Sequence, residues 1–268
     1  MTVPTARGVE FGLGLIGIGK PWGFANPLVP DERQARTLLE RAFTLGVRYF
    51  DTAPSYGVSE ERLGRFLGAL TAGERSAVRI ATKFGEHWDD ARAEPFVDHS
   101  FEALKRSLDG SVGRLGHIDF LQLHKTTPEV LRSADLARAW EYAAGLGITA
   151  IGASVSDVES AGLAIADGAY GILQFPYNAV QQTFAGVLEV ASARGMKVAI
   201  NRPFGMGRML YENRELSKAD AFGFILEKRF EGVILSGTKS AEHLEENWRA
   251  FGEALGRREG GREEYGHR

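Results

Sequence analysis

The feature that most constrains this chain is an alternation, repeated eight times, of a short apolar run with a longer segment of helical periodicity. Apolar runs of about four to eight residues are typical of buried strands, and apolar residues three and four positions apart are typical of amphipathic helices. Strands that alternate with helices predict a parallel sheet whose crossover connections are those helices. The expected strand and helix pairs are residues 11–18 with 31–45, 48–53 with 59–70, 78–83 with 97–115, 118–124 with 133–146, 149–155 with 157–166, 171–177 with 184–194, 197–202 with 218–228, and 232–236 with 241–251.

Eight pairs of this spacing favour an α/β fold of the TIM type, a closed (β/α)8 barrel. We expect one barrel domain over residues 1–255 and a polar, glycine-rich tail over residues 256–268. The alternative is an open doubly wound sheet, which would need a glycine-rich turn leading directly from the first strand into the first helix. Glycines follow the first strand, but Pro21 and Pro27 separate them from the helix. The barrel is therefore the predicted fold.

Composition limits the classes of function that are open to the chain. Of its 268 residues, 44% are hydrophobic and 25% are charged, which suits a globular domain with a large core. The formal net charge of -3 gives no general attraction to nucleic acid or to anionic membranes. Cysteine is absent, which excludes disulfides and thiolate metal sites. Without a secretory signal at the start or an apolar run of about 18 residues, we expect a cytoplasmic protein that binds neither membranes nor nucleic acid.

Side chains of complementary chemistry stand at the ends of three consecutive predicted strands. Asp51 and Tyr56 belong to the end of the second strand, Lys83 to the third and His124 to the fourth. Because the carboxyl ends of barrel strands meet at one mouth, we expect these four side chains to lie together. The Lys83 ammonium would lower the pKa of the phenol from about 10, and Asp51 would keep that lysine charged. With His124 orienting a carbonyl oxygen, the set suits proton donation to a carbonyl as hydride arrives.

Each of these residues also has an ordinary structural explanation, such as a strand-end cap, a surface ion pair, a turn aromatic or a hydrogen-bonded core imidazole. Their coincidence at neighbouring strand ends favours a catalytic set. Two other functions stay open: a cofactor-binding regulatory or scaffold protein with little turnover, and an aldolase that forms a Schiff base on Lys83. No metal is expected, because the remaining histidines lack the spacing of metal ligands. Among them are His87, His99, His117 and His243.

Seven segments resemble the aldo-keto reductases in order and spacing, and they cover nearly the whole chain. Three of them contain the four residues above: Asp51-Thr-Ala-Pro-Ser-Tyr56-Gly-Val-Ser-Glu-Glu-Arg-Leu-Gly, Ala-Thr-Lys83-Phe-Gly and Ile-Asp-Phe-Leu-Gln-Leu-His124. The others are Ile151-Gly-Ala-Ser154, Gln174-Phe-Pro-Tyr-Asn178, Asn201-Arg-Pro-Phe-Gly205 and Gly237-Thr-Lys-Ser-Ala-Glu-His-Leu-Glu-Glu-Asn247. The resemblance implies NAD(P)(H)-dependent interconversion of an aldehyde, ketone or sugar and an alcohol. It also implies that Tyr56 is the acid/base, that Lys83 and Asp51 tune it, and that His124 orients the substrate.

The same resemblance implies a nicotinamide cofactor site. Ser154 and Gln174 match residues that hold the nicotinamide amide, whereas Val155 stands where the family has Asn. Asn201 stands where many members have a stacking Tyr, and Arg202 beside it is suited to the pyrophosphate. The adenosine phosphate would lie at the start of the last helix. The expected cofactor residues are Gly14, Asp51, Ser154, Gln174, Asn201, Arg202, Ser236, Gly237, Thr238, Lys239, His243, Glu246 and Asn247.

NADPH is expected to be favoured over NADH, but only modestly, because His243 stands where an Arg is frequent in the family. The expected substrate is a small carbonyl compound or alcohol in a relatively open pocket. Lys125, next to His124, would favour an acidic or polyhydroxylated one. The predicted pocket residues are Trp22, Tyr56, Phe84, Trp88 and His124. The sequence names neither the physiological substrate nor the direction of the reaction nor the oligomeric state.

Overall fold

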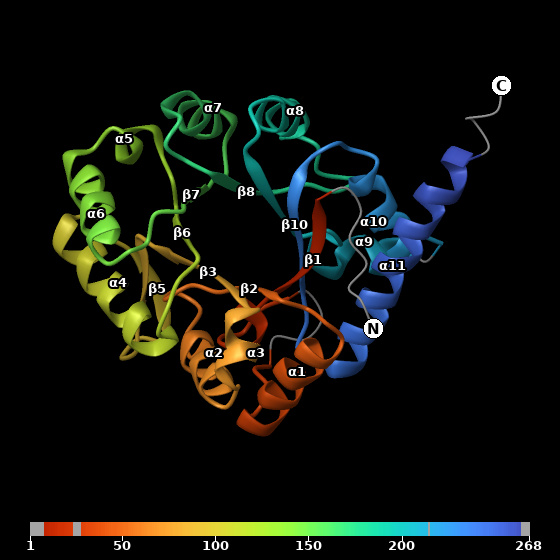
Figure 1. Ribbon diagram of the computed structural model, residues 1–268, viewed down its shortest axis with the longest axis horizontal. Coiled ribbons are helices and arrows are strands. Elements are labelled where there is room, and N and C mark those ends of the chain that lie inside the picture. Colours follow the sequence, from red (N-terminus) through yellow and green to blue (C-terminus); the bar gives the residue numbers. More distant parts are fainter. Residues whose placement is uncertain (1–7, 24–27, 214, 264–268) are drawn as a thin grey trace.

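Eight parallel strands close into a barrel, and helices surround it (Figure 1). This architecture comes from a computed structural model that describes residues 8–23, 28–213 and 215–263. Around the barrel the strands follow the order β1 (Val9–Gly14), β10 (Glu231–Gly237), β9 (Lys197–Asn201), β8 (Ile172–Pro176), β7 (Ile151–Ser154), β6 (Phe120–Leu123), β3 (Arg79–Phe84) and β2 (Tyr49–Asp51). The ring closes where β1 pairs with both β2 and β10. The predicted fold is therefore confirmed.

The helices that follow the barrel strands pack on the outside of the ring (Figure 1). They are α1 (Glu32–Thr44), α2 (Ser59–Gly68), α4 (Phe101–Leu115), α6 (Ala134–Gly145), α7 (Val158–Asp167), α8 (Ala185–Ala193), α10 (Lys218–Leu226) and α11 (Ala241–Glu263). The first shows why its sequence starts a helix. The Asp31 side chain accepts a hydrogen bond from the Gln34 backbone N–H at 2.7 Å, and the Gln34 side chain accepts one from the Asp31 N–H at 2.9 Å. This reciprocal capping box satisfies two N–H groups that the helix leaves free.

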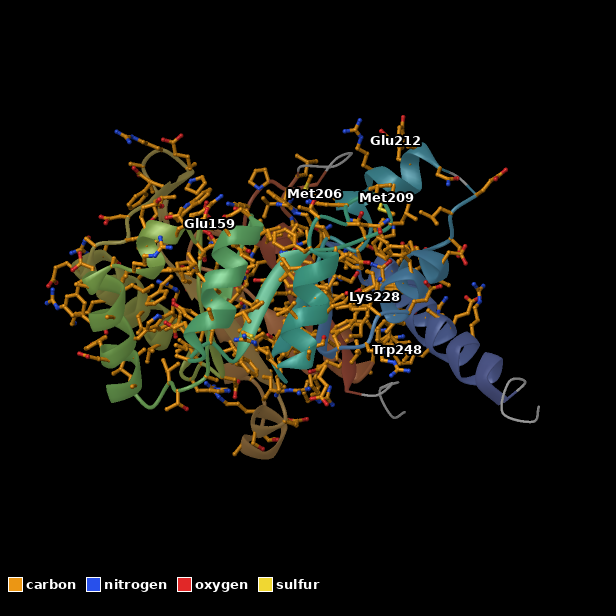
Figure 2. The ribbon with its side chains drawn as sticks, turned by 90° about the horizontal axis from the view of Figure 1, so that it is seen from above. Glu159, Met206, Met209, Glu212, Lys228 and Trp248 are labelled. Carbon is orange, nitrogen blue, oxygen red and sulfur yellow. The ribbon has the colours of Figure 1, made fainter. Side chains whose placement is uncertain are left out.

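Several short elements lie between the strands and helices that the sequence predicts. An antiparallel hairpin, β4 (Glu86–Asp89) and β5 (Glu94–Val97), follows β3 and takes up the start of the expected helix 97–115, which begins instead at Phe101. The short helical elements are η1 (Ile16–Ile18), α3 (Ala72–Ser76), α5 (Pro128–Leu131), η2 (Gly205–Gly207) and α9 (Arg208–Glu212). Figure 2 places Met206, after β9, towards the same end of the molecule as Glu159 at the start of α7. Both follow strands, so this is the end at which the strands finish.

The last helix continues beyond the expected end at residue 251 and reaches Glu263. It therefore passes the predicted domain boundary at residue 255, which stays a prediction. Residues 1–7 of the expected barrel domain and residues 264–268 of the expected tail lie outside the described residues. In the part of the chain that the structure describes, no helix combines the length and apolar character that a membrane span requires.

The core has two layers. The larger one lies between the strands and the helices, and the smaller one fills the inside of the barrel. The interior cluster consists of Tyr49, Ala81, Ile172, Ala199, Val233 and Leu235, with Phe120 packed against it. An apolar plug of this kind makes the barrel a solid platform for side chains at its mouth.

Candidate active site

One ring of inward positions lies directly above the apolar plug. Side chains two residues apart on a strand point to the same side. Each position of the ring comes two residues after a residue that either belongs to the interior cluster or packs against it. The pairs, cluster residue first, are Tyr49 and Asp51, Ala81 and Lys83, Phe120 and Gln122, Ile172 and Gln174, Ala199 and Asn201, and Leu235 and Gly237. The barrel thus brings five of the predicted site residues to one mouth and adds Gln122, which sequence reasoning missed.

A buried ion pair lies in this ring. The Lys83 Nζ donates to Asp51 Oδ1 at 2.7 Å and to the Thr52 carbonyl oxygen at 2.9 Å, and the Lys83 side chain is 1% exposed. Gln122 Nε2 donates to the other Asp51 oxygen at 3.4 Å. Burial acts to lower the pKa of Lys83, but the charge of Asp51, its hydrogen bond and the neighbouring Tyr56 together raise it. Lys83 is therefore held charged beneath the mouth, as the sequence predicts.

Tyr56 reaches the mouth from the turn between β2 and α2. Its N–H donates to the Ala53 carbonyl oxygen at 3.0 Å, and its own carbonyl oxygen accepts from Ser59 at 3.2 Å. Two glycines make room for this turn. A Cβ on Gly19 would lie 1.7 Å from the Tyr56 carbonyl oxygen, and one on Gly57, which has φ +57°, would lie 2.4 Å from the Gly19 carbonyl oxygen. The first loop of the barrel can therefore approach the Tyr56 backbone only because both positions lack a side chain.

The phenol of Tyr56 faces both Lys83 and His124. The Lys83 Nζ lies 5.0 Å from the centre of the Tyr56 ring, and the His124 ring centre lies 6.0 Å from it, edge to face. Burial raises the pKa of Tyr56 above its ordinary value, and the Asp51 charge adds to this rise, whereas the Lys83 charge opposes it. The expected effect of Lys83 is present but smaller than that of burial. Tyr56 is therefore protonated at neutral pH, with an ammonium nearby that favours the phenolate.

His124 follows β6 and is held by its backbone. Its N–H donates to the Phe84 carbonyl oxygen at 2.9 Å, and its own carbonyl oxygen lies 2.9 Å from His99 Nε2. Its Nδ1 lies 3.2 Å from Glu86 Oε2 and 3.5 Å from the Ser55 hydroxyl. Burial holds the pKa of His124 well below its usual range, and the charges of nearby lysines lower it further. The imidazole is therefore neutral near neutral pH.

Glu86 is a second site residue, after Gln122, that sequence reasoning missed. It is the first residue of the unpredicted hairpin and is only 6% exposed. Its Oε1 lies 3.1 Å from the Lys125 Nζ. The charge of Lys125, which the sequence suggested for substrate binding, is therefore paired within the protein. The only local signal for Glu86 was the glycine before it, which marks a turn but not its direction.

The predicted pocket residues separate into two groups. Trp88 lies at the mouth, where the Lys20 Nζ lies 5.6 Å from the centre of its ring and 5.6 Å from that of Tyr56. Trp22 lies beside Arg202, whose guanidinium is 6.0 Å from the indole. Phe84, by contrast, is fully buried and packs on Trp140 of α6, with ring centres 4.7 Å apart. Because Phe84 follows inward-pointing Lys83, it points outward to the helices and does not line the pocket.

The positions expected to hold a nicotinamide lie on β7, β8 and β9. Ser154 pairs with Gln174 in the sheet register, and Asn201 ends the next strand. Gln174 Oε1 and Asn201 Oδ1 are both buried without a hydrogen-bond partner. Val155, at the place of the expected Asn, is 4% exposed and packs in the outer core. It therefore offers no polar contact.

The positions expected to hold the adenosine phosphate surround the start of α11. Gly14 and Gly237 are register partners on β1 and β10. The Ser240 hydroxyl accepts from the His243 N–H at 3.3 Å, and the Thr238 hydroxyl accepts from the Ser240 N–H at 3.2 Å. These capping contacts occupy two N–H groups at the helix start. The Lys239 Nζ donates to the Leu28 carbonyl oxygen at 2.9 Å.

The last predicted cofactor residues have partners of their own. Glu246 forms an ion pair with the Lys218 Nζ at 2.6 Å, and this contact lowers the pKa of Glu246. Asn247 Nδ2 donates to the buried Ser236 hydroxyl at 3.0 Å, which leaves Asn247 Oδ1 without a partner. Arg202 is exposed and has φ +55° at the end of β9. Within the described ranges, no group of three or more His, Cys, Asp and Glu side chains is arranged to hold a metal ion.

The chain is thus a closed (β/α)8 barrel with an Asp, a Lys, a Tyr and a His at the ends of its second to fourth barrel strands. The Aldo/keto reductase family model matches residues 10–223, and the chain belongs to this family. It is similar to the aldo-keto reductase str7 of Strobilurus tenacellus, with 26% identity over 206 residues that cover 74% of this chain and 59% of the relative. It is also similar to the L-galactose dehydrogenase of Arabidopsis thaliana, with 37% identity over 117 residues that cover 42% of this chain and 33% of the relative.

A solved structure from Pseudomonas aeruginosa, described as that of an aldo-keto reductase, has the same fold. Its TM-score is 0.76 and its identity 26%, over 92% of this chain and 91% of that chain. The chain spans only 33% to 59% of the length of the two curated relatives named above.

Proposed function

We propose that this chain interconverts carbonyl compounds and alcohols with a nicotinamide cofactor as the hydride carrier. The observation that carries the proposal is the buried Asp51 and Lys83 ion pair beside Tyr56. Taking two charges out of water is costly, so such a pair is a poor device for stability alone. Here its ammonium acts on the phenol of Tyr56, which lies at the mouth beside His124. The pair is therefore best explained by the chemistry of Tyr56.

In this proposal Tyr56 donates a proton to the carbonyl oxygen. The raised pKa of Tyr56 keeps the proton on the phenol until it is needed. The Lys83 ammonium then stabilises the phenolate that remains, because an opposite charge close by favours the ionised form. Asp51 holds Lys83 in place, and His124 orients the substrate from the other side of Tyr56.

The residues at the β7 to β9 end of the mouth fit a nicotinamide. The bound cofactor would supply or accept the hydride. Its carboxamide carries an N–H₂ donor, and Gln174 Oε1 and Asn201 Oδ1 are buried acceptors that lack one. Ser154, beside Gln174, adds a hydroxyl. Val155 supplies no contact, so we propose that Asn201 replaces the amide partner that the family has at position 155.

We propose that NADPH is favoured over NADH, by a modest margin. The start of α11 and the charge of Lys239 suit an additional phosphate. His243 is exposed, and its charge acts on Glu246, which follows three residues later in α11. It can contribute less reliably than an Arg, whose guanidinium is always charged.

A cofactor titration followed by a carbonyl panel tests the proposal. Intrinsic fluorescence is followed while NADPH or NADH is added in the presence of a chelator, and turnover is then measured with aldehydes, ketones and sugars. We expect saturable binding of both cofactors, tighter for NADPH, and turnover of at least one substrate class. Binding of neither cofactor would refute the cofactor assignment. Tight cofactor binding without turnover on any carbonyl compound or alcohol would favour a binding protein over an enzyme.

A further inference from the structure

Glu86 is a buried carboxylate at the mouth that the proposed chemistry leaves without a role. Both of its oxygens have partners: Oε2 lies 3.2 Å from His124 Nδ1, and Oε1 lies 3.1 Å from the Lys125 Nζ. At 6% exposure, a carboxylate must be compensated by such contacts. The partners of Glu86 are thus two consecutive residues, one of which is in the predicted catalytic set.

The backbone is shaped to bring these residues together. Gly85 has φ +101°, and a Cβ there would lie 2.6 Å from the His99 ring and 3.1 Å from the His124 carbonyl oxygen. Only glycine fits this turn, which leads directly from Lys83 and Phe84 to Glu86. On the other side Lys125 has φ +53°, an unfavourable value for a residue with a side chain. Strain of this kind persists where the surrounding contacts impose it, as they do at functional sites.

The contact with Glu86 decides which imidazole nitrogen carries the proton. A neutral imidazole has one N–H donor and one acceptor nitrogen, and a carboxylate can only accept. Nδ1 must therefore carry the proton if it is to bond to Glu86, and Nε2 becomes the acceptor. The other groups around the ring oppose a second proton, because burial and the charges of Lys83, Lys125 and Lys20 all act in that direction. His99, Tyr56 and Ser55 complete the surroundings of the ring.

We propose that Glu86 is a positioning residue that holds His124 as the Nδ1–H tautomer, so that Nε2 presents a hydrogen-bond acceptor to the substrate. This inference rests on the proposed function, in which His124 orients the substrate. A carboxylate that sets an imidazole tautomer through Nδ1 is a recurrent device in catalytic sites. Nε2 has no hydrogen bond or ion pair recorded with any described residue, which leaves it for a ligand.

The tautomer has a consequence for the substrate. A carbonyl oxygen can only accept hydrogen bonds, so it pairs with the protonated Tyr56 and not with an acceptor nitrogen. Nε2 instead needs a donor, which a hydroxyl on the carbon next to the carbonyl can supply. The site therefore discriminates in favour of substrates with a hydroxyl beside the reacting carbon. Glu86 sets this preference, since it determines that His124 accepts.

A spectroscopic measurement tests the tautomer without any cofactor or turnover. The chain has six histidines, so the ¹⁵N-histidine side-chain resonances are assigned by comparison with His124→Asn. Near neutral pH we expect His124 to show a protonated Nδ1 and an unprotonated Nε2. In Glu86→Gln the amide can either donate or accept, so both tautomers should be populated. The control is Glu94→Gln, the same change at an exposed position of β5.

A kinetic comparison tests the consequence for the substrate. Hydroxyacetone and methoxyacetone share a similar inductive effect at the carbonyl, but only the first can donate to Nε2. One hydrogen bond corresponds to about a 2- to 10-fold preference for hydroxyacetone in kcat/KM, mainly through KM. Glu86→Gln should bring this ratio towards one, because His124 can then donate to either ligand. Glu94→Gln should leave the ratio as in the wild type.

The outcomes separate this inference from the proposed function. A wild-type His124 that carries its proton on Nε2 would overturn the inference even if the enzyme is active. So would a substrate ratio that is the same in the wild type and in Glu86→Gln. If the expected tautomer is found and no carbonyl compound is turned over, the assignment to Glu86 stands and the proposed function fails. If Glu86→Gln does not fold, the wild-type resonances decide the question alone.

Discussion

At the scale of single residues, Lys83 and Tyr56 differ in how far neighbouring charges compensate for the effect of burial on their pKa values. Burial disfavours the charged form of each, which lowers the pKa of Lys83 and raises that of Tyr56. Asp51 and Tyr56 together more than reverse the effect of burial on Lys83, whereas Lys83 only partly reverses the effect of burial on Tyr56. The result is an ammonium beside a neutral phenol, which is the arrangement that a proton donor to a carbonyl requires.

Replacing Tyr56 with Phe tests this arrangement most directly. The change deletes the hydroxyl and hardly alters the shape, so cofactor affinity should be nearly unchanged. Because general acid catalysis contributes about 10²- to 10⁴-fold, we expect kcat to fall by that factor or more. Steady-state kinetics and a cofactor titration of the variant check both parts. Wild-type kcat in Tyr56→Phe on a good substrate would show that the assignment to Tyr56 is wrong.

Replacing Lys83 with Met should cause a comparable loss of turnover through Tyr56. Removing the ammonium takes away the contact that lowers the pKa of Tyr56, so that pKa should rise further. Alcohol oxidation needs a deprotonated acceptor and its rate increases with pH, so in the variant this increase should move to higher pH. The measurement is the pH–rate profile of oxidation for wild type and variant.

The same variant has a structural cost and a coupling that can be checked. It leaves Asp51 buried without its partner, which typically costs about 3–5 kcal/mol, so folding is verified by urea denaturation. Because Lys83 acts through Tyr56, the losses in Lys83→Met and Tyr56→Phe should not multiply in the double variant. A double variant that shows the full product of the two losses would mean that Lys83 acts independently of Tyr56.

At the scale of elements, the loop after β1 and the turn before α2 depend on each other. The Gly19 and Gly57 backbones lie so close together that a Cβ on either glycine would overlap a carbonyl oxygen of the opposite segment. Gly19→Ala should therefore displace Tyr56, lowering stability by about 1–3 kcal/mol and kcat by more than the loss of stability alone would cause. Gly68→Ala is the control, since a Cβ there meets nothing within 4 Å at the end of α2. Urea denaturation and kinetics of both variants distinguish the local clash from a general effect of alanine.

The unpredicted hairpin shows which elements cannot be predicted from local sequence patterns. Trp88 and Glu86 come from β4, which has only four residues and pairs with the equally short β5. Such short strands are exposed on much of their surface and carry no clear alternation of apolar and polar residues. For this reason the predicted helix 97–115 included Val97, although α4 begins only at Phe101.

At the scale of the whole molecule, the buried carboxylate of Glu60 links α2, β3 and α4 through hydrogen bonds. Glu60 of α2 accepts from Thr82 of β3 at 2.5 Å and from Ser111 of α4 at 2.9 Å. It also accepts from the Arg114 Nε at 2.8 Å. Thr82 directly precedes Lys83, so this contact anchors the strand that bears the buried ammonium.

Glu60→Gln should destabilise the protein by about 1–3 kcal/mol, because the amide cannot satisfy all the donors that the carboxylate accepts. Arg114 is partly exposed and can turn to water, which limits the cost. Urea denaturation gives the free energy of unfolding, and Glu61→Gln, at an exposed position of the same helix, serves as the control. A loss equal to that of Glu61→Gln would show that the buried network contributes nothing.

The sequence by itself determined the barrel, its strand and helix pairs and the meeting of Asp51, Lys83, Tyr56 and His124. It could do so because buried parallel strands and amphipathic helices are encoded in local periodicity, and because strand ends of a barrel necessarily converge. Only the tertiary structure decided that burial raises the pKa of Tyr56 and that Glu86 reaches His124. Desolvation and contacts between residues 38 positions apart depend on the packing of the whole chain, which no local pattern contains.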